Sequence, residues 1–451
     1  MSLLAICIWP SAPFTESLVR KALESLDTSV KILTSIPDAP PNASLVQWSS
    51  YDEIEHEFSM NESILQSSYI IRKSLIRKHF LSRCIFSYLT KHPESVLKSA
   101  WPRTYEIEIS FADELDELFA DELWELGKEL GSSQRWWILK PGMADRGNGI
   151  RMFNDRETLE KILEEFEEEE EQEEKEDQSK QELNTAVMIS QLRHFVIQEY
   201  ILNPLLLDPR EVMIGPDTLK PNVLEGYKFH LRAYCVASGA LTLYLYNRVL
   251  ALFSSVPYSV PNAQNDLQVD LTPHLTNTSL QTHRGEEGVR LLDELVGCHI
   301  LSENFEHHPI LTSEDVSDIL RQIAVVLADT FKAALETPIN FQAIPNAFEL
   351  FGVDFLVAED LNYIEGGSRF QVKLLEINAE PAIELTGPRL AWILEDLFVD
   401  IGKVCVEPFF ATQLSSIQAG ANSSDESPWP VGETRRNLVK CLEVEVRRRS
   451  L

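Results

Sequence analysis

The hydrophobic and polar positions of this chain repeat with two periods, and together they predict a mixed α/β protein. Apolar runs of strand length occur at residues 3–9, 31–34, 136–140, 150–153, 195–201, 349–357 and 371–377, and residues 227–234 alternate strictly between polar and apolar. Helical spacing of apolar residues predicts helices at 15–26, 313–331, capped by Ser313, and 392–406. Residues 241–246 and 249–253 are expected to form a hairpin with Asn247 at its turn.

The stretch 371–381 contains a buried strand that carries two polar residues near its end. A period of two places Glu376 and Asn378 side by side on one face of this strand. A carboxylate and an amide oxygen suit Mg²⁺, which prefers oxygen ligands and takes substrate phosphates into its shell. We therefore expect a magnesium site at this point.

The preceding apolar strand, residues 349–357, is interrupted by one carboxylate, Asp354. A buried aspartate is costly unless it is paired or bound to a metal. The two strands are consecutive and, in the simplest arrangement, antiparallel, so Asp354 can converge with Glu376 and Asn378. This convergence strengthens the prediction of a metal site.

Two further segments carry groups that suit phosphate. Residues 141–149 form a glycine-rich loop between two strands, with Lys140 at its base, and backbone N–H groups of such loops can surround phosphate oxygens. The loop lacks the Gly-Lys-Ser/Thr of a P-loop and opens no helix, so Walker and Rossmann sites are excluded. In residues 227–234, Lys228, His230 and Arg232 share one face, which is typical of a polyphosphate site or, equally, of a solvated edge strand.

Charge is distributed unevenly. The net charge of −31 argues against nucleic-acid binding through a general basic surface. Residues 157–182 hold 14 carboxylates and three lysines and are expected to be a solvated, poorly ordered insertion. A basic cluster in this acidic chain predicts either a solvated helix face or a surface for an acidic partner; its members are Arg72, Lys73, Arg77, Lys78 and Arg83.

Length and cysteine usage define the protein class. The 451 residues are enough for two or three domains, and the six scattered cysteines indicate neither a disulfide framework nor a zinc site. We expect an intracellular, cytoplasmic protein with no signal peptide and no membrane span. Residues 413–451, rich in Ser, Gly, Asn and Pro with a basic end, are expected to be a disordered tail.

Seven short motifs in fixed order resemble the tubulin–tyrosine ligase family of the ATP-grasp superfamily, and its fungal members in particular. The motifs are residues 137–141 with the glycine loop, 197–201, 228–232, 245–248, 274–277, 351–355 and 374–378. The resemblance implies an α/β (α+β) ATP-grasp fold in which two lobes grip ATP between antiparallel sheets. Its expected parts are a small N-terminal α/β lobe (1–67), a central lobe (68–197), a C-terminal lobe with the Mg²⁺ site (198–412) and the tail (413–451).

The resemblance also implies a role for each matching residue. Lys140 and Lys228 would hold the phosphates of ATP under the loop that carries Gly142, Arg146, Gly147 and Gly149. Gln198 with the backbone of Glu199 and Tyr200 would bind adenine, and His230 stands where many relatives have an acidic residue that contacts the nucleotide. Arg232 and Arg248 would face the acyl phosphate and the acceptor carboxylate, with Thr276 and Asn277 in the same cleft; Asp354, Glu376 and Asn378 would hold Mg²⁺.

The implied activity is an ATP- and Mg²⁺-dependent ligation of an amino acid, tyrosine first, to a protein carboxylate such as the C-terminus of α-tubulin. The enzyme would act as a monomer through an acyl phosphate. Two alternatives stay open on the sequence: a ligase that adds glutamate or glycine to tubulin, and a non-catalytic ATP-grasp scaffold in an RNA-processing assembly.

Overall fold

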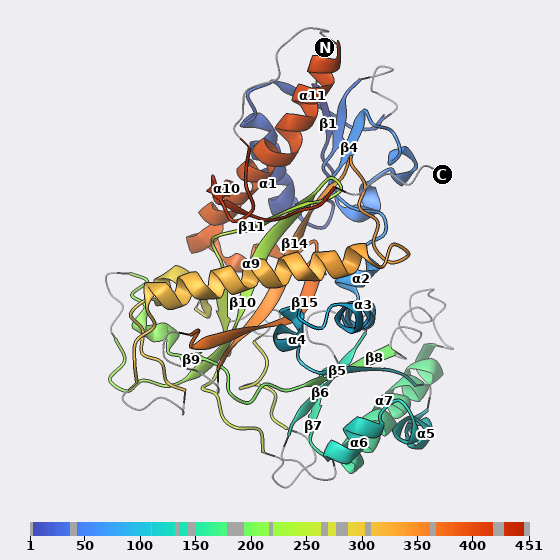
Figure 1. Cartoon of the computed structure of the whole chain (residues 1–451), viewed down its shortest axis with the longest axis vertical. Coiled ribbons are helices and arrows are strands. Elements are labelled where there is room, and N and C mark those ends of the chain that lie inside the picture. The colour runs from blue at the N-terminus through green and yellow to red at the C-terminus, as the bar shows by residue number, and fades with distance from the viewer. Residues whose placement is uncertain are drawn as a thin grey trace.

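The computed structural model describes residues 3–36, 43–109, 111–130, 135–142, 149–177, 194–215, 220–262, 269–276, 287–302, 308–360, 367–417 and 428–445. The strands within these residues form three sheets. The four-stranded N-terminal sheet lies at one end of the molecule and a four-stranded antiparallel sheet at the other, with a large sheet and a long helix, α9, between them (Figure 1).

The N-terminal sheet is parallel and has the order β2-β1-β3-β4. Its strands are β1 (Leu3–Ile6), β2 (Val30–Leu33), β3 (Leu45–Gln47) and β4 (Ile64–Gln66). Helix α1 (Pro13–Glu24) connects β1 to β2 and buries its apolar stripe of Leu18, Val19 and Ala22. The β-α-β order that the hydrophobic pattern predicts is therefore present.

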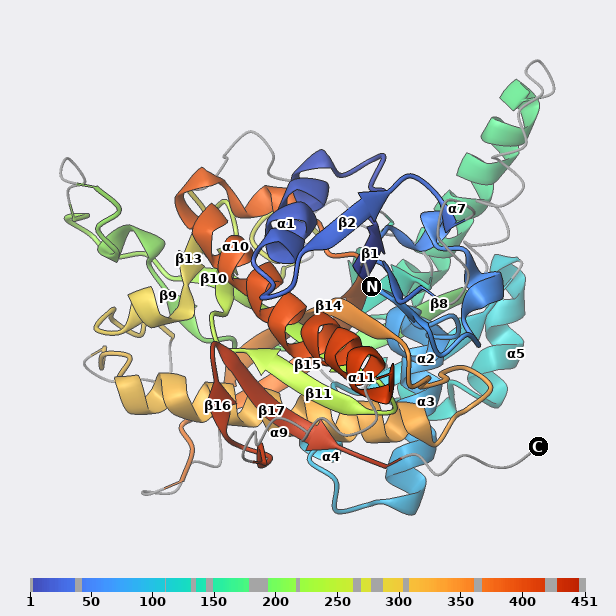
Figure 2. The same cartoon turned by 90° about the horizontal axis from the view of Figure 1, so that it is seen from above.

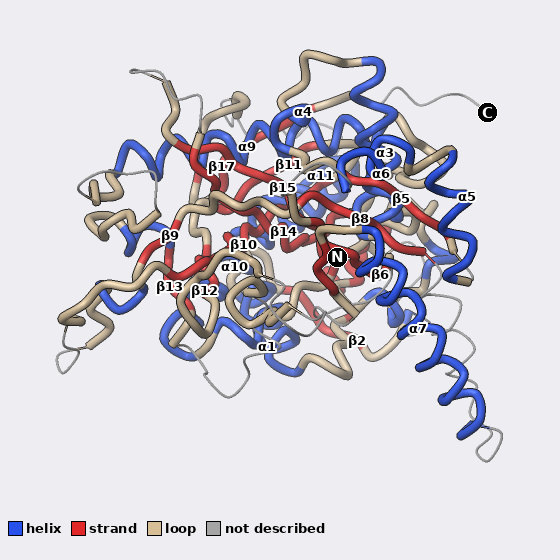
Figure 3. Tube along the Cα trace, turned by 90° about the horizontal axis from the view of Figure 1, so that it is seen from below, coloured by secondary structure: helices blue, strands red, loops and turns tan. Residues whose placement is uncertain are grey.

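The second sheet is antiparallel, in the order β5-β8-β6-β7. It consists of β5 (Thr104–Glu108), β6 (Trp137–Pro141), β7 (Arg151–Phe153) and β8 (His194–Glu199), with helices α5 (Leu115–Ala120), α6 (Trp124–Leu130) and α7 (Arg156–Asp177). Helix α7 extends away from the body of the molecule (Figures 2 and 3). The expected poorly ordered insertion is therefore wrong for residues 157–177, because Leu159, Ile162, Leu163 and Phe166 recur at helical spacing and anchor the helix in a core with β6 and β8. Residues 178–182 lie outside the described residues.

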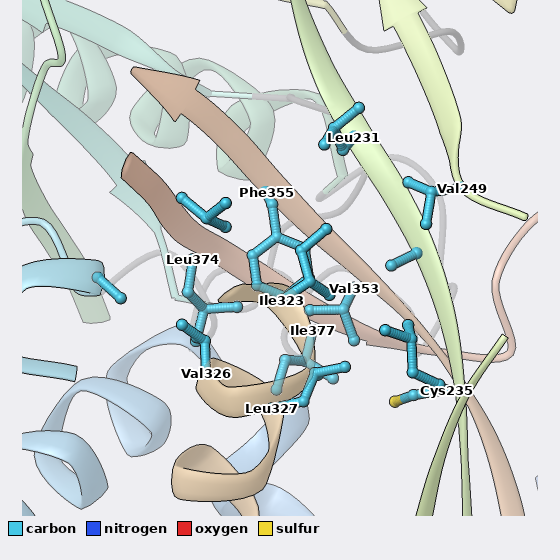
Figure 4. Packing of buried hydrophobic residues seen from close by; sticks show 14 of the residues in the cluster. Leu231, Cys235, Val249, Ile323, Val326, Leu327, Val353, Phe355, Leu374 and Ile377 are labelled. Atoms are coloured by element: carbon cyan, nitrogen blue, oxygen red, sulfur yellow. The ribbon is translucent and has the colours of Figure 1, made fainter. Parts of the chain in front are cut away.

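The central sheet is built around β10 (Tyr227–Ser238). On one side β10 pairs with β14 (Phe348–Glu359), which in turn pairs with β15 (Phe370–Ala379), and both pairings are antiparallel. Helix α9 (Ser313–Leu335) packs Ile323, Val326 and Leu327 against Phe355, Leu374 and Ile377 of these strands (Figure 4). The side chain of Thr312 caps α9, so the expectation that Ser313 caps it is wrong by one residue.

On its other side β10 pairs with β11 (Thr242–Tyr246) and β12 (Leu250–Phe253). The expected hairpin of these two segments is wrong. Both run antiparallel to β10 along the same edge, β11 beside Cys235–Ser238 and β12 beside Phe229–Arg232, with residues 247–249 between them. Asn247 and Arg248 are polar residues between two apolar runs. They interrupt the row of residues that pairs with one edge of β10, and the chain does not reverse direction there. The short strands β9 (Leu206–Leu207) and β13 (Val289–Leu291) pair with β10 and β12.

The C-terminal part continues the central sheet. Helices α10 (Ala391–Ile401) and α11 (Glu407–Ile417) lead to β16 (Thr434–Arg435) and β17 (Leu438–Glu443), and β17 pairs with β11. The expected disorder of residues 413–451 is therefore wrong for residues 413–417, which end α11, and for residues 428–445, where Leu438, Cys441 and Leu442 are buried against the core. Residues 418–427 and 446–451 lie outside the described residues. The boundaries at 67, 197 and 412 remain a proposal.

Three helices connect the sheets: α2 (Lys73–Ile76), α3 (Lys78–Lys91) and α4 (Leu97–Ala100). The basic cluster lies on α2 and α3 and at their ends, and it does not form one free surface. Arg72 is buried against Glu349, Lys78 pairs with Glu376, and Arg83 pairs with Glu106. Most of the cluster therefore neutralises carboxylates of the same chain, so neither a wholly solvated face nor a wholly available docking surface describes it.

All six cysteines lie within the described residues, where each is buried and unpaired. None of the helices in the described part of the chain has an apolar stretch long enough to cross a membrane.

Candidate nucleotide and metal site

A pocket of about 930 Å³, partly open to solvent, lies where the antiparallel sheet β5–β8 faces the central sheet. It brings together most of the residues that the sequence predicts for the site. Its polar walls are formed by Lys78, Lys140, Gln198, Glu199, Tyr200, Lys228, His230, His274, Thr276, Asp354, Glu376 and Asn378. Strands β6 and β8 contribute from one lobe, and β10, β14 and β15 contribute from the other.

The three expected metal ligands converge. Asp354 on β14 is the register partner of Glu376 on β15, and Asn378 Nδ2 lies 3.4 Å both from Asp354 Oδ2 and from Glu376 Oε1. Here the amide nitrogen of Asn378 donates toward both carboxylates, and a half-turn of the amide would bring its oxygen to the same place. Two carboxylates and one amide oxygen would fit Mg²⁺, a cation that prefers oxygen ligands. No group of three or more His, Cys, Asp and Glu residues suited to a metal occurs among the described residues. Asn378 is thus essential to the proposed donor set.

Positive charge surrounds these carboxylates. Arg232 donates from both Nε and Nη2 to Asp354, the second at 2.9 Å, and Lys78 Nζ lies 3.3 Å from Glu376 Oε2. Burial alone would raise the pKa of Glu376, but Lys78, Lys140 and Arg232 outweigh it and lower that pKa to about 2. Glu376 is therefore ionised throughout the physiological range, as a metal ligand must be.

Lys140 and Lys228 are buried amines inside the pocket. Lys140 Nζ donates to Gln198 Oε1 at 2.7 Å, and Lys228 Nζ donates to Tyr200 Oη at 3.1 Å and to the carbonyl of His274 at 3.0 Å. Burial lowers the pKa of Lys140 to about 8 and that of Lys228 to about 7. Because their hydrogen-bond acceptors are neutral, both ammonium groups would be strongly stabilised by a polyanion such as a polyphosphate.

The site also contains an unsatisfied imidazole nitrogen. His230 Nδ1 lies 2.5 Å from Thr276 Oγ1, whereas His230 Nε2 lacks a hydrogen-bond partner among the described residues and sits 3.6 Å from Asp354 Oδ1. Burial lowers the pKa of His230. A neutral imidazole with one unsatisfied nitrogen in the pocket wall is suited to contact a bound ligand.

Next to these charges, one wall of the pocket is apolar. Ile138, Ile201, Leu356 and Leu375 line it beside Gln198, Glu199 and Tyr200, where β8 ends. A flat ring can pack on such aliphatic side chains while backbone groups at a strand end bind its edge. The wall therefore suits the base of a nucleotide, as the resemblance implies.

The glycine loop is described only at its two ends. Gly142 donates its N–H to the carbonyl of His194 at 2.6 Å, and a Cβ at this position would lie 2.7 Å from His79 Nδ1, so no larger residue fits. Gly149 lies against Pro141 at the other end. Arg146 and Gly147, together with Asn277 of the 274–277 motif, lie outside the described residues. The roles of Arg146 and Gly147 over the phosphates and of Asn277 in the cleft stay predictions.

Arg248 is not brought into this pocket. It sits in the break between β11 and β12, where its guanidinium lies 4.7 Å from the centre of the Trp392 ring and Nη2 lies 3.5 Å from Asn437 Oδ1. Its expected contact with an acceptor carboxylate stays a prediction. Arg232 does not line the pocket surface itself and reaches the site through Asp354.

Sequence reasoning missed Lys78 as a site residue. The sequence pattern groups Lys78 with the basic cluster, because its neighbours in sequence indicate a surface role. Lys78 is the first residue of α3, and its side chain enters the pocket at Glu376. The sequence offers one signal for Lys78, which is a cluster of cations in a chain where carboxylates outnumber lysine and arginine. No periodicity links residue 78 to residue 376.

Comparison with known proteins agrees with this geometry. Residues 59–414 match the model of the family described as "Tubulin-tyrosine ligase family". The chain is 36% identical to the Saccharomyces cerevisiae protein named "Probable tubulin--tyrosine ligase PBY1", over 94% of this chain and 52% of that protein. A Schizosaccharomyces pombe protein with a similar description is also 36% identical, over 86% of this chain and 89% of that protein. The chain thus spans about half the length of the budding-yeast relative.

A solved structure is similar along nearly the whole chain. It is the C-terminal domain of Pby1 from K. lactis, reported as an ATP-grasp enzyme interacting with the mRNA decapping enzyme Dcp2. The similarity covers 99% of this chain and 100% of that one, with a TM-score of 0.64 and 29% sequence identity. The expected ATP-grasp fold is therefore confirmed.

Proposed function

The chain belongs to the tubulin–tyrosine ligase family, and from this premise we propose that it is an ATP-dependent ligase that joins a free amino acid to a protein carboxylate. Tyrosine is the first candidate for the amino acid and the C-terminus of α-tubulin for the acceptor. One observation carries the proposal: Asp354, Glu376 and Asn378 converge in the same pocket as the buried amines of Lys140 and Lys228.

The reaction class follows from the chemistry of a carboxylate. A carboxylate resists attack by an amine because oxide would have to leave. Transfer of the γ-phosphoryl group of ATP to one carboxylate oxygen gives an acyl phosphate and ADP. The amine, after losing a proton to solvent, then attacks the acyl carbon, the C–O bond to phosphate breaks, and an amide and inorganic phosphate remain.

Each group in the pocket has a role in this sequence. The apolar wall holds adenine, and the ammonium groups of Lys140 and Lys228 bind the phosphates and balance their charge. Asp354, Glu376 and Asn378 would hold Mg²⁺, which neutralises charge on the phosphoryl oxygens when bound. Arg232 fixes the Asp354 carboxylate and places a permanent cation beside the point of transfer. The described site offers no role for an enzyme nucleophile, and this reaction needs none.

The protein acceptor has a second candidate. The K. lactis neighbour, similar over 99% of this chain, is reported to interact with Dcp2, so a component of the mRNA decapping machinery is an alternative partner or acceptor for this chain. A cytoplasmic location and a monomeric state fit either acceptor and stay predictions. Glutamate and glycine stay alternatives for the amino acid.

The proposal is tested by incubating the purified chain with Mg·ATP, detyrosinated tubulin and labelled tyrosine, glutamate or glycine in separate reactions. We expect one amino acid to be incorporated, with loss of incorporation when ATP is omitted. A parallel reaction replaces tubulin with Dcp2. ATP binding without incorporation into either protein would contradict the ligase proposal and favour the scaffold alternative.

A further inference from the structure

A second large pocket, of about 1230 Å³ including its open mouth, lies between the N-terminal sheet and the central sheet. Its base is aromatic: the Trp48 ring stacks on Phe398 at 5.9 Å and meets Phe348 edge-on at 5.3 Å. Its rim is polar and carries the exposed carboxylates of Asp52, Glu380 and Glu384. None of the groups assigned above to nucleotide or metal lines this pocket.

Both pockets are lined by one face of β14, and Glu349 from the opposite face also lines the second pocket. Side chains alternate along a strand, so positions 348, 350, 352, 354 and 356 share one face. Phe348 and Leu350 line the second pocket, whereas Asp354 and Leu356 line the nucleotide pocket. The rise of a strand places Leu350 about 13 Å from Asp354. Gly352 lies between them, where a Cβ would be 2.7 Å from Pro381 Cβ and 3.3 Å from Arg232 Cδ.

The order of groups along β10 gives the two pockets a direction. Lys228 Nζ lies 3.1 Å from Tyr200 Oη, Arg232 binds Asp354, and Tyr234 is the register partner of Gly352. A nucleotide with its base on the apolar wall beside Tyr200 and its phosphates at the lysines therefore points its terminal phosphate toward Arg232. The second pocket lies beyond that end, on the side from which a second substrate must reach the acyl phosphate.

Besides ATP, the proposed reaction has two substrates, the free amino acid and the protein acceptor. The charge of the second pocket distinguishes between them. Among the described residues that line it, the one cation is Arg72, and Arg72 is already paired with the buried Glu349 and with Ser68. The rim adds the three carboxylates of Asp52, Glu380 and Glu384. An acidic acceptor segment would be repelled here, whereas an ammonium group would be attracted. The aromatic base favours an apolar or aromatic side chain over a carboxylate.

We propose that this second pocket binds the free amino acid that is joined, with its ammonium group at the rim carboxylates and an aromatic or apolar side chain on the Trp48–Phe348–Phe398 base. The inference rests on the proposed ligase function. Of the three rim carboxylates, Glu380 is the nearest in sequence to the proposed metal ligand Asn378, and it accepts a hydrogen bond from the backbone N–H of Tyr51. The next residue, Pro381, packs over Gly352. Residues 380–384 all line the second pocket. At the other end of this segment, Glu384 accepts a hydrogen bond from Thr15 Oγ1 at 3.2 Å.

Direct binding tests the pocket without requiring turnover. Calorimetric titration of the full chain, loaded with Mg·AMP-PNP, measures the affinity for L-tyrosine, L-phenylalanine, L-glutamate and 3-(4-hydroxyphenyl)propionate, which is tyrosine without its amine. Ala382→Trp places an indole in the pocket at an exposed lining position, and Ala411→Trp on the exposed face of α11 is the matched control. Glu380→Gln removes one rim charge without a change in side-chain size.

We expect tyrosine to bind at least tenfold more tightly than its amine-free analogue and than glutamate. Ala382→Trp should weaken tyrosine binding at least tenfold and leave AMP-PNP binding unchanged, Ala411→Trp should change neither, and Glu380→Gln should reduce the preference for the amine. Equal tyrosine affinity in Ala382→Trp and wild type, or no binding of any of these amino acids, would overturn the inference.

Failure of the pocket and failure of the ligase are distinguishable in the same preparation. Ligation that proceeds at the wild-type rate and KM for tyrosine in Ala382→Trp would keep the ligase function and overturn the pocket. Tyrosine binding that Ala382→Trp abolishes, without ligation by wild type, would support the pocket and contradict the ligase function. If Ala382→Trp does not fold, the loss of amine preference in Glu380→Gln decides the question.

Discussion

The ammonium group of Lys78 lies 3.3 Å from the carboxylate of Glu376. Lys78 begins α3, which packs on α9 and contributes Leu81, Cys84 and Ile85 to the core of the central sheet, while also contacting β5 and β8. Glu376 belongs to β15. The ion pair therefore fixes the first residue of α3 to the proposed metal ligand. It also contributes to the low pKa of Glu376, about 2, against the opposing effect of burial.

Replacement of Lys78 should impair the metal site through Glu376. In Lys78→Met the pKa of Glu376 rises, so the acid limb of the pH profile of kcat/KM should move to higher pH, and the Mg²⁺ concentration for half-maximal activity should rise about tenfold. Lys73→Met, which removes an exposed cation on α2, is the control and should leave both unchanged. An unaltered Mg²⁺ requirement in Lys78→Met would contradict a positioning role.

Nucleotide binding should take up protons near neutral pH. Lys228 and Lys140, with pKa values of about 7 and about 8, are partly neutral in the free protein at pH 8, and bound phosphates would raise both pKa values. At about pH 6 both amines are charged, so AMP-PNP affinity should be highest there and fall as pH rises toward 9. Calorimetry at pH 8 in buffers of different ionisation enthalpy should detect uptake of about one proton. Affinity that is flat from pH 6.5 to 9 would contradict the placement of phosphate at these amines.

Gly352 separates the two pockets, and a methyl group there should disturb both. Its Cβ would lie 2.7 Å from Pro381 Cβ, so Gly352→Ala must displace Pro381 or Arg232. We expect at least tenfold lower ligation and a loss of about 1–3 kcal/mol in unfolding free energy. Gly402→Ala is the control, because its Cβ would make ordinary contacts, the nearest at 3.4 Å from Leu26 Cδ2. Equal activity of the two variants would show that this contact is unimportant.

The buried pair of Arg72 and Glu349 should contribute strongly to stability. Burial raises the pKa of Glu349 to about 7, although Arg72 and the N–H of Tyr69 oppose this. Arg72 stabilises the ionised form of Glu349, which is populated above pH 7, so Arg72→Met should cost about 3–5 kcal/mol in chemical denaturation at pH 9. The loss should shrink as pH falls from 9 to 7 and below, because the protonated carboxyl needs no counter-charge, and Arg72→Met/Glu349→Gln should recover part of it at pH 9. A loss below about 1 kcal/mol at pH 9 would contradict this account.

Much of the site could be predicted because strand periodicity survives folding. The alternation at 227–234 places Lys228 and His230 in the pocket and Phe229 and Leu231 in the core, where the sequence alone left open a solvated edge strand. The structure removes that ambiguity, since β10 is flanked by β14 on one edge and by β11 and β12 on the other. Pairing partners of a strand depend on segments far away in sequence, and its own pattern cannot specify them.

The errors have a common physical cause, which is tertiary packing that overrides local composition. Helix α7 is highly acidic yet keeps Ile162 and Phe166 on one stripe, and those side chains hold its first turns to the sheet. The many polar residues near the C-terminus predict a disordered tail, but β17 lies among them. It pairs with β11 and buries Leu438 and Leu442. The role of Lys78 cannot be predicted from local sequence for the same reason. Its partner, Glu376, lies 3.3 Å away in space but on a strand that is distant in sequence.

The most direct test of the account is the effect of Glu376→Gln on ATP-dependent amino-acid incorporation. This variant keeps the size of the side chain and removes the charge that the proposed metal site requires, whereas Glu359→Gln, a buried carboxylate at the far end of β14, serves as the control. We predict that Glu376→Gln abolishes Mg·ATP-dependent ligation with its circular dichroism spectrum unchanged, and that Glu359→Gln retains activity. Wild-type turnover in Glu376→Gln would contradict the assignment of the metal site and with it the proposed mechanism.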